Sequence, residues 1–247
     1  MKLLLLDIET APNIAYTWGL YNQNISINQI SKAGYMLCWA AKWLGEDTMA
    51  FASLRRGRVS MLERMHRLLS EADAVITYNG KKFDIPTLNK EFLVAGMKPP
   101  APYKHIDLYQ IIRSTFRFAS NKLDWISQQL EVGHKVEHKG FDLWLGCMAG
   151  NLEDWKIMEE YNRHDVTLLE EAYTIVQPWI RTHPSHGAHS DAAVCPKCGS
   201  DDYQHRGFAF TNMLKYRRYR CNACGGWFRS NKTVSPRREE RMANIAA

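Results

Sequence analysis

The hydrophobic runs in the first part of the chain predict strands. Residues 2–9 form an apolar run with the length and composition of a buried strand. Two further runs, 34–44 and 47–54, have strand character and are separated only by Gly45 and Glu46. Because so short a connection suits neighbouring antiparallel strands, we expect the three runs to form an antiparallel meander.

The following residues, to about position 180, alternate short apolar runs with segments of helical periodicity. Between residues 59 and 71, for example, apolar side chains recur at helical spacing, which is typical of a helix with one buried face. The expected strands are 74–78 and a strand end at 105–108, and the expected helices are 59–71, 85–95, 109–116, 123–130 and 152 to about 179. A meander followed by alternating strands and helices predicts a three-layer α/β domain with a mixed sheet.

The composition is that of a globular protein, with its positive charge at one end. Hydrophobic residues make up 45% and charged residues 23% of the 247 residues. Residues 191–247 hold eleven of the 32 basic and five of the 26 acidic residues, so they carry the whole net charge of +6 and residues 1–190 are formally neutral. A basic end on a neutral body is typical of an element that binds a polyanion, although a solubilising tail has the same composition.

Export or membrane insertion is not indicated. The aliphatic run near the start, 3–6, is interrupted by Asp7 and is too short for the apolar core of a signal peptide. A membrane span needs about 20 apolar residues in a row. We therefore expect a soluble, cytoplasmic protein without membrane contact.

Two acidic residues end the first predicted strand. Asp7 and Glu9 are two positions apart, so on a strand both side chains leave the same face. Two neighbouring carboxylates on an apolar strand repel each other and are costly to bury. A divalent cation would compensate for both effects. Alternatively, the strand ends at Leu6 and both acids are solvated.

Further acidic residues accompany later elements. Asp84 lies at the start of a predicted helix, after a strand and a turn that contains Asn79 and Gly80. Tyr161 and Asp165 are four residues apart on the last helix, so they project from the same face. Taken alone, Asp84 is compatible with a helix cap and Asn79 with a turn residue. The other pair is compatible with an exposed acid beside a core tyrosine.

In order and type, these residues resemble the DEDD superfamily of 3′→5′ exonucleases, in the branch that carries tyrosine. The chain supplies the three motifs Asp7-Ile-Glu9, Asn79-x3-Phe83-Asp84 and Tyr161-x3-Asp165. Segment 121–130 also resembles the segment that precedes the third motif in the proofreading domain of family B DNA polymerases. The whole resemblance covers roughly residues 1–180. The histidine branch would need histidine at position 160, where this chain has Glu160.

The resemblance implies a ribonuclease H-like fold and hydrolysis of phosphodiester bonds with two Mg²⁺ or Mn²⁺ ions, which prefer oxygen ligands. It implies that Asp7 bridges the two ions and that Glu9 and Asp165 hold the ion that activates water. Asp84 would support the other ion. Tyr161 would orient the attacking water as a hydrogen-bond partner, since a free phenol has a pKa of about 10.

The resemblance also points to substrate contacts. Asn79 and Phe83 are candidates to contact the terminal nucleotide, although Phe83 could also belong to the core. Asp107 opens a predicted helix, and we expect it to be a structural cap. The expected partner is nucleic acid, DNA rather than RNA, at single-stranded ends. An RNA-trimming exoribonuclease and a catalytically inactive zinc-ribbon adaptor are the alternatives.

Four cysteines near the end of the chain form two CxxC pairs, which are Cys195, Cys198, Cys221 and Cys224. In a chain without an export signal, this spacing indicates a metal rather than disulfides. Four thiolates match a tetrahedral structural Zn²⁺ site, and metal binding would supply the folding energy of so small a module. The module resembles zinc ribbons of transposase and transcription-factor type. A redox pair and an iron centre are the alternatives.

Basic and aromatic residues alternate just before the second cysteine pair. The basic members are Lys215, Arg217, Arg218 and Arg220, and tyrosines lie between them. On a strand these side chains divide between two faces, so basic groups could meet phosphates while tyrosines pack or stack on bases. An ordinary ribbon strand with a solvated basic face has the same pattern.

These patterns divide the chain into four parts. We expect a ribonuclease H-like domain over 1–182, a linker over 183–193, the zinc ribbon over 194–231 and a basic flexible tail over 232–247. The linker is polar and lacks hydrophobic periodicity. Its three histidines could bind metal, but we interpret the segment as a polar linker.

Overall fold

The structure is a computed structural model in which residues 1–234 are described. The chain divides into two compact units: residues 2–173 form the first, and the second begins at residue 174. This division falls inside the last long helix. The predicted end of the first domain at residue 182 instead marks the end of the helical sequence pattern, and it stays a prediction. The predicted basic tail lies, from residue 235 onward, outside the described residues.

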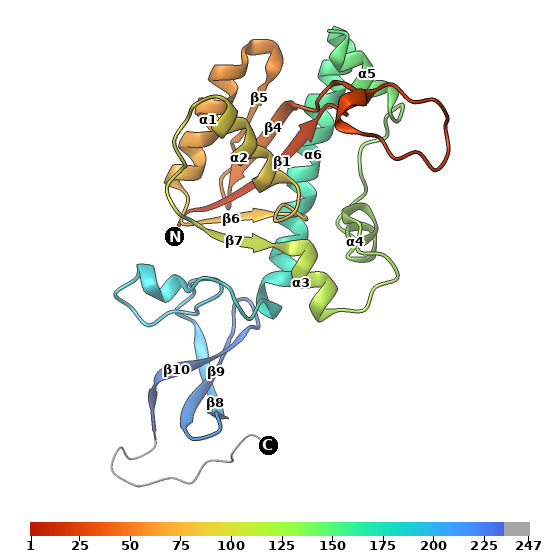
Figure 1. The fold of residues 1–247 in the computed structure, drawn as a ribbon. Coiled ribbons are helices and arrows are strands. Elements are labelled where there is room, and N and C mark those ends of the chain that lie inside the picture. Colours follow the sequence, from red (N-terminus) through yellow and green to blue (C-terminus); the bar gives the residue numbers. More distant parts are fainter. Residues whose placement is uncertain (235–247) are drawn as a thin grey trace. The chain divides into compact units, whose positions relative to one another are not determined.

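A five-stranded mixed sheet forms the centre of the first unit, in the order β5-β4-β1-β6-β7 (Figure 1). Its strands are β1 (Leu3–Thr10), β4 (Met36–Trp43), β5 (Met49–Ser53), β6 (Ala74–Thr77) and β7 (Lys104–Asp107). β4 is antiparallel to both β1 and β5, and β6 is parallel to both β1 and β7. The predicted meander and mixed sheet are therefore confirmed.

Six α-helices accompany this sheet within the described residues. They are α1 (Arg58–Glu71), α2 (Asp84–Val94), α3 (Leu108–Thr115), α4 (Leu123–Gln129), α5 (Asp142–Met148) and α6 (Leu152–Val176), and α6 runs into a 3₁₀ turn at Gln177–Trp179. No helix in this part of the chain is both long and apolar enough to cross a bilayer.

Two short features have no counterpart in the sequence-based prediction. One is α5, which has only seven residues. The other is a hairpin of β2 (Ile14–Ala15) and β3 (Ile30–Lys32), whose strands have two and three residues. Elements this short contain too few positions to establish a hydrophobic period.

Alternation along β1 directs its side chains to two cores. Leu4, Leu6 and Ile8 pack with buried residues of α1 and α2 on one face of the sheet. Asp7 and Glu9 therefore leave the opposite face. On that face, residues of α5 and α6 pack against β4, so the two acids point to the layer that contains α6.

The second unit contains an antiparallel sheet of three strands in the order β10-β9-β8, which are β8 (Tyr203–Phe210), β9 (Lys215–Cys221) and β10 (Trp227–Thr233). The preceding segment, interpreted as a linker, contains a 3₁₀ turn at His186–His189. The backbone N–H of His186 donates to the carbonyl of Pro196 at 3.0 Å. This hydrogen bond ties the segment to the first cysteine pair.

The turn between β6 and α2 requires glycine at one position. The backbone N–H of Gly80 donates to Thr77 Oγ1 at 3.1 Å, and a Cβ atom on Gly80 would lie 2.2 Å from the same oxygen. Asn79 precedes it with a φ of 66°, a left-handed conformation that asparagine tolerates better than most residues. The close approach of Gly80 to Thr77 sets the path of the chain into α2.

We expect Gly80→Ala to lower the free energy of unfolding by about 2 kcal/mol, because a buried methyl group overlaps Thr77 and the turn must shift. Chemical denaturation measures the effect. Gly45→Ala is the matched control: its Cβ would meet nothing within 4 Å, so only the φ of 82° is strained. Equal destabilisation by the two variants would contradict the steric explanation.

Candidate active site

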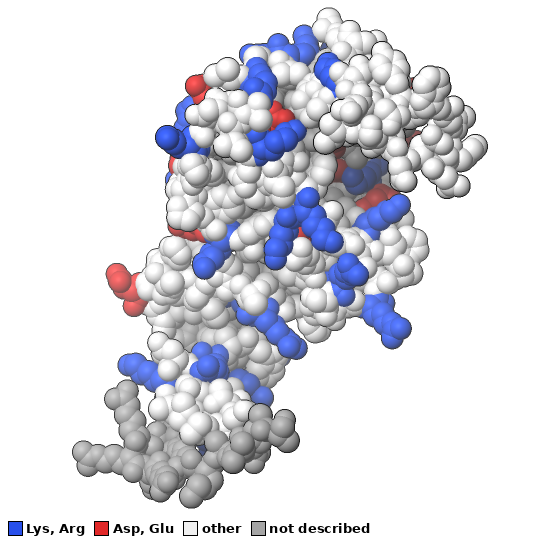
Figure 2. All heavy atoms as spheres, in the orientation of Figure 1, with Lys and Arg blue, Asp and Glu red and all other residues white. Residues whose placement is uncertain are grey.

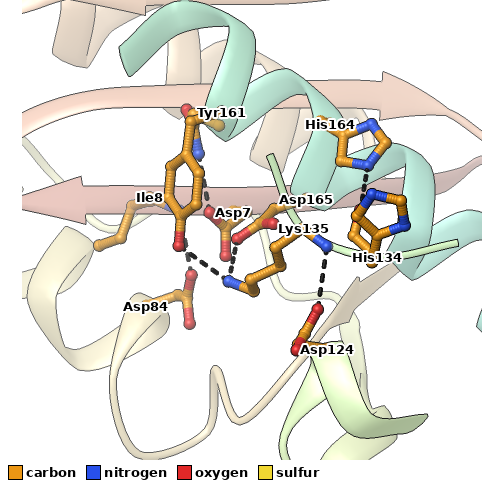
Figure 3. Close-up of polar contacts among 10 residues, drawn as sticks. Asp7, Ile8, Asp84, Asp124, His134, Lys135, Tyr161, His164 and Asp165 are labelled. Atoms are coloured by element: carbon orange, nitrogen blue, oxygen red, sulfur yellow. Dashed lines mark hydrogen bonds and ion pairs between the residues drawn. The ribbon is translucent and has the colours of Figure 1, made fainter. Parts of the chain in front are cut away.

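Three carboxylates of the first unit converge at the end of β1. Asp7 and Glu9 project from β1 and Asp165 projects from α6, and one oxygen of each lies within 4.8 Å of the others. Asp84, at the first turn of α2, lies near Asp7 and Asp165 (Figure 3). Acidic residues that the sequence places far apart thus meet in one place.

A short β6 makes room for α2 at this end of the sheet. In the parallel register Leu5 pairs with Ile76, and β6 ends at the next residue, Thr77. The backbone N–H of Ile8 lies beyond this end and donates to Asp84 Oδ1 at 3.2 Å. The carboxylate of Asp84 therefore takes the place of a strand carbonyl and is fixed against β1.

A buried asparagine connects α6 to β1. Asn162 Nδ2 donates to Asp7 Oδ2 at 2.7 Å, and the asparagine has no exposed surface. Asn162 follows Tyr161 in α6, so its hydrogen bond to Asp7 holds this part of the helix, with Tyr161 and Asp165, next to Asp7. The sequence does not identify Asn162 as a site residue, because the type of a polar residue on a long helix does not show which strand the residue contacts.

A lysine from an irregular segment enters the acidic cluster. Lys135 Nζ donates to Asp165 Oδ2 at 2.5 Å and to the hydroxyl of Tyr161 at 2.9 Å. Its backbone N–H donates to Asp124 Oδ1 of α4 at 2.9 Å. Burial alone would lower the pKa of Lys135, but the charge of Asp165 raises it above the usual value. No motif marks this residue in the sequence.

Burial raises the pKa of every carboxyl group in the cluster. It raises the pKa of Glu9 to about 8 and the pKa of Asp84 to about 7. Burial, followed by the charges of the three other carboxylates, raises the pKa of Asp7 well above its usual value. The pKa of Asp165 is raised by burial, although Lys135 opposes the shift. The ionised cluster therefore needs more positive charge than one lysine supplies.

The donor set fits a hard divalent cation. All the candidate ligands are carboxylate oxygens, which Mg²⁺ and Mn²⁺ prefer. Asp165 Oδ1 is buried without a hydrogen-bond partner, whereas buried polar atoms are normally satisfied. A cation bound by Asp7, Glu9 and Asp165 would satisfy this oxygen and reduce the repulsion.

A cavity of about 450 Å³ opens beside the carboxylates. Its lining includes Asp7 and Asp165 together with Tyr78, Asn79 and Tyr109. Asn79 is thus both a turn residue and part of the wall of the cavity. The volume is large enough for part of a nucleotide.

The structure shows whether Phe83 belongs to the core and whether Asp107 caps a helix. The side chain of Phe83 is 43% exposed, so it is not a core residue. Asp107 caps α3 by accepting from the backbone N–H of Gln110, which confirms the expected structural role. It also accepts from the backbone N–H groups of Asn79 and Lys81, both at 3.0 Å. The cap therefore also shapes the turn that lines the cavity.

Aromatic side chains surround Tyr161. The side chain of Trp144 from α5 is close enough to Glu9 to lower the pKa of that carboxyl group, against the larger effect of burial. The rings of His138 and Trp144 lie at 4.9 and 5.9 Å from the ring of Tyr161, both in edge-on geometry. Burial raises the pKa of Tyr161 above its usual value, so the phenol stays protonated. The sequence does not indicate either residue, because His138 lies in an irregular segment and Trp144 lies on a helix of only seven residues.

The four predicted zinc cysteines also come together, in the second unit. Their sulfurs all lie within 4.8 Å of one another, and the pairs Cys195–Cys224 and Cys198–Cys221 are 3.8 and 3.6 Å apart. These separations are too long for disulfides of about 2.05 Å. They match the edge of a thiolate tetrahedron around Zn²⁺, about 3.8 Å for Zn–S bonds of about 2.3 Å. The cluster fits a structural zinc ion.

The predicted basic residues lie on β9 and are interleaved with aromatic rings. Lys215 Nζ lies 3.9 Å from the ring centroid of Phe208, and the guanidinium of Arg218 lies 5.0 Å from that of Trp227. Arg217 and Arg220 are exposed on the same strand. All four basic side chains are thus carried by one strand of the second unit.

Comparison with known proteins identifies the family. Residues 4–177 match the RNase H superfamily. The chain belongs to this superfamily. A solved structure with a similar fold is the family B DNA polymerase from the hyperthermophilic archaeon Pyrobaculum calidifontis, with a TM-score of 0.54 and 15% identity. The match covers 72% of this chain but only 25% of the polymerase chain. No curated protein sequence matches the chain.

Membership in the RNase H superfamily confirms the fold predicted from the sequence. It also supports a nuclease activity, which depends on divalent metal ions in this superfamily. The acidic cluster, the orphaned oxygen of Asp165 and the adjacent cavity provide a place for such chemistry.

The stability of this RNase H superfamily protein should depend on pH through the carboxylates. Without added divalent ions, Glu9 has a pKa of about 8 when folded but an ordinary one when unfolded. The protonated form is favoured in the folded state, so this contribution is complete below about pH 4.5 and is lost as the pH rises to about 8. We expect Tm to fall over this range, and Mn²⁺ to raise Tm more at pH 8 than at pH 5.5.

Glu9→Gln is the matched control for this prediction, because the amide keeps the shape of the side chain but does not titrate. Differential scanning calorimetry of both proteins measures the difference in the slope of Tm against pH. A Tm of the wild-type protein that rises relative to Glu9→Gln as the pH increases would contradict the assignment.

Proposed function

We propose that this chain is a metal-dependent 3′→5′ exonuclease that hydrolyses phosphodiester bonds at single-stranded ends of DNA. The observation that carries the proposal is the convergence of Asp7, Glu9 and Asp165 within 4.8 Å, with Asp84 near Asp7 and Asp165. No other cluster of carboxylates in the described residues has this geometry. The choice of exonuclease and of DNA follows the motif resemblance to proofreading domains.

The residues of the cluster have separate tasks in this proposal. Asp7, Glu9 and Asp165 would hold one Mg²⁺ or Mn²⁺ ion, and Asp84 would share a second ion with Asp7. Bound divalent ions in such sites neutralise charge on the entering and leaving oxygens of the phosphate. The hydrogen bonds from Ile8 and Asn162 orient two of these carboxylates before any ion binds.

Tyr161 acts as a hydrogen-bond donor to the attacking water rather than as a base. Its raised pKa keeps the proton on the phenol at neutral pH. Lys135 contacts the phenol oxygen and Asp165, and the rings of His138 and Trp144 limit its movement. The hydroxyl group is therefore held in position beside the carboxylates.

The terminal nucleotide would occupy the cavity next to the carboxylates. Asn79 is placed in its wall by the strained turn and by the hydrogen bond from its backbone to Asp107. Phe83 is exposed at the start of α2, where its ring is available to a base or sugar. Both residues are proposed substrate contacts.

The second unit would aid binding of nucleic acid. One Zn²⁺ held by the four cysteines would stabilise the ribbon, since a module of this size has little apolar core. The basic side chains on β9, which are Lys215, Arg217, Arg218 and Arg220, would contact phosphates, and the neighbouring rings would stack on bases.

Hydrolysis of 3′- or 5′-labelled single-stranded DNA and RNA tests the enzymatic proposal. We expect release of mononucleotides from the 3′ end of DNA with Mg²⁺ or Mn²⁺ and none with EDTA. Asp7→Ala and Asp165→Ala should each lower kcat by a factor of about a hundred or more, because each removes a ligand of the charge-neutralising ions.

Glu63→Ala, which removes an exposed carboxylate from α1, is the matched control and should keep full activity. Retained hydrolysis in pure Asp7→Ala protein would contradict the assignment of the carboxylate cluster as the active site. Release of mononucleotides from RNA alone would indicate an exoribonuclease, and inactivity on both polymers would indicate an adaptor.

Zinc content tests the second unit separately. We expect one Zn²⁺ per chain by atomic emission, and we expect Cys221→Ser to lose it while hydrolysis of short oligonucleotides persists. Cys147→Ala removes a buried thiol of the first unit and should leave the zinc content unchanged. Full zinc occupancy in Cys221→Ser would refute the four-thiolate assignment.

A further inference from the structure

A second feature of the first unit is an exposed aromatic loop. It comprises residues 14–27, between the end of β1 and β3, and no Lys, Arg, Asp or Glu occurs from residue 11 to residue 31. Trp18 is 100% exposed, Tyr21 84% and Tyr16 76%. Large apolar side chains are seldom so exposed without a partner, so this loop has the character of a binding surface.

Hydrogen bonds give the aromatic loop a defined shape. The backbone N–H of Tyr16 donates to the carbonyl of Gln29 at 3.0 Å, and Gln29 Nε2 donates back to the carbonyl of Tyr16 at 2.9 Å. The backbone N–H of Ser26 donates to Gln29 Oε1 at 2.9 Å. The rings are therefore carried by a closed loop rather than by an extended chain.

The base of the aromatic loop adjoins the acidic cluster. Ala11 immediately follows β1 and is buried in the same core cluster as Tyr161. In Figure 1 the loop projects on the side of the sheet that carries α4 and α5. Figure 2 shows it as an uncharged lobe, and acidic and basic side chains are visible in the hollow beneath it.

Basic residues line the cavity beside the carboxylates and a second cavity next to it. Lys122 lines the same cavity as Asp7 and Asp165. Lys82 and Arg113 line a neighbouring cavity of about 280 Å³ on α3. In Figure 2, Lys and Arg side chains are spread over this part of the surface, whereas the lobe has none.

We propose that the aromatic loop binds the unpaired bases of single-stranded DNA upstream of the 3′ end. Bases are uncharged and flat, so they stack on Tyr16, Trp18 and Tyr21, while their phosphates face the basic residues. The uncharged loop does not attract the sugar–phosphate backbone, whereas the basic residues do. This difference in charge determines that the bases face the loop and the phosphates face the basic residues. The inference rests on the proposed function, since it describes how a strand reaches that site.

The aromatic loop adds affinity without taking part in hydrolysis. Stacking of one base on a ring strengthens binding by a factor of about five or more. A substrate long enough to reach the loop should therefore bind more tightly than a dinucleotide, which fills only the site. This dependence on length separates a strand-binding loop from a merely structural one.

The test compares the double variant Trp18→Ala/Tyr21→Ala with the wild-type full chain. The substrates are dT12, a single-stranded oligonucleotide of about twelve thymidines, and the dinucleotide dTdT. We expect the variant to raise KM for dT12 at least about tenfold, with kcat and the hydrolysis of dTdT unchanged. Trp18→Phe/Tyr21→Phe keeps the rings and should restore KM. Leu93→Ala, which removes another highly exposed apolar side chain, this one from α2, is the matched control.

Binding of fluorescent dT12 to the same variants on an Asp7→Ala background gives a readout that does not need activity. A higher Kd in the alanine double variant supports the proposal. An unchanged Kd and KM in the alanine double variant overturn the proposal. This holds even if the same variant loses binding to a protein, because the loop would then serve a protein partner and not DNA. A wild-type protein that binds dT12 through the loop but hydrolyses neither substrate would defeat the proposed function and leave this inference standing.

Discussion

Repulsion between the half-buried Asp7 and Glu9 and the buried Asp165 is the constraint on which the site depends. β1 carries Asp7 and Glu9 into an apolar sheet, and α6 adds Asp165 within 4.8 Å of both. Burial raises the pKa of each group, so the folded protein holds them ionised only with compensation. Lys135 supplies one positive charge, and Ile8 and Asn162 supply hydrogen bonds. One oxygen of Asp165 stays buried without a hydrogen-bond partner, which fits the proposed binding of a metal ion.

The parts of the structure that follow local patterns could be predicted from the sequence. The two-residue period of β1 places Asp7 and Glu9 on one face, and the four-residue spacing on α6 aligns Tyr161 with Asp165. The mixed sheet and most helices follow from hydrophobic periodicity, and the match to the RNase H superfamily confirms that fold.

Other parts depend on packing between distant segments and leave no local signal. Lys135 comes from an irregular segment, and its position is set by Asp124 on α4. Trp144 lies on a helix of seven residues, too short for a recognisable period. The exposure of Trp18 is equally invisible in the sequence, because an apolar side chain between two strands is normally expected to be buried.

The most direct test of the central claim is anomalous diffraction from crystals of this protein grown with Mn²⁺. The account predicts a strong anomalous peak coordinated by Asp7, Glu9 and Asp165, with Asp165 Oδ1 among the ligands and Lys135 displaced from at least one of its present contacts. A crystal saturated with Mn²⁺ that shows no peak among these three side chains, with Lys135 still bound to Asp165, would contradict it.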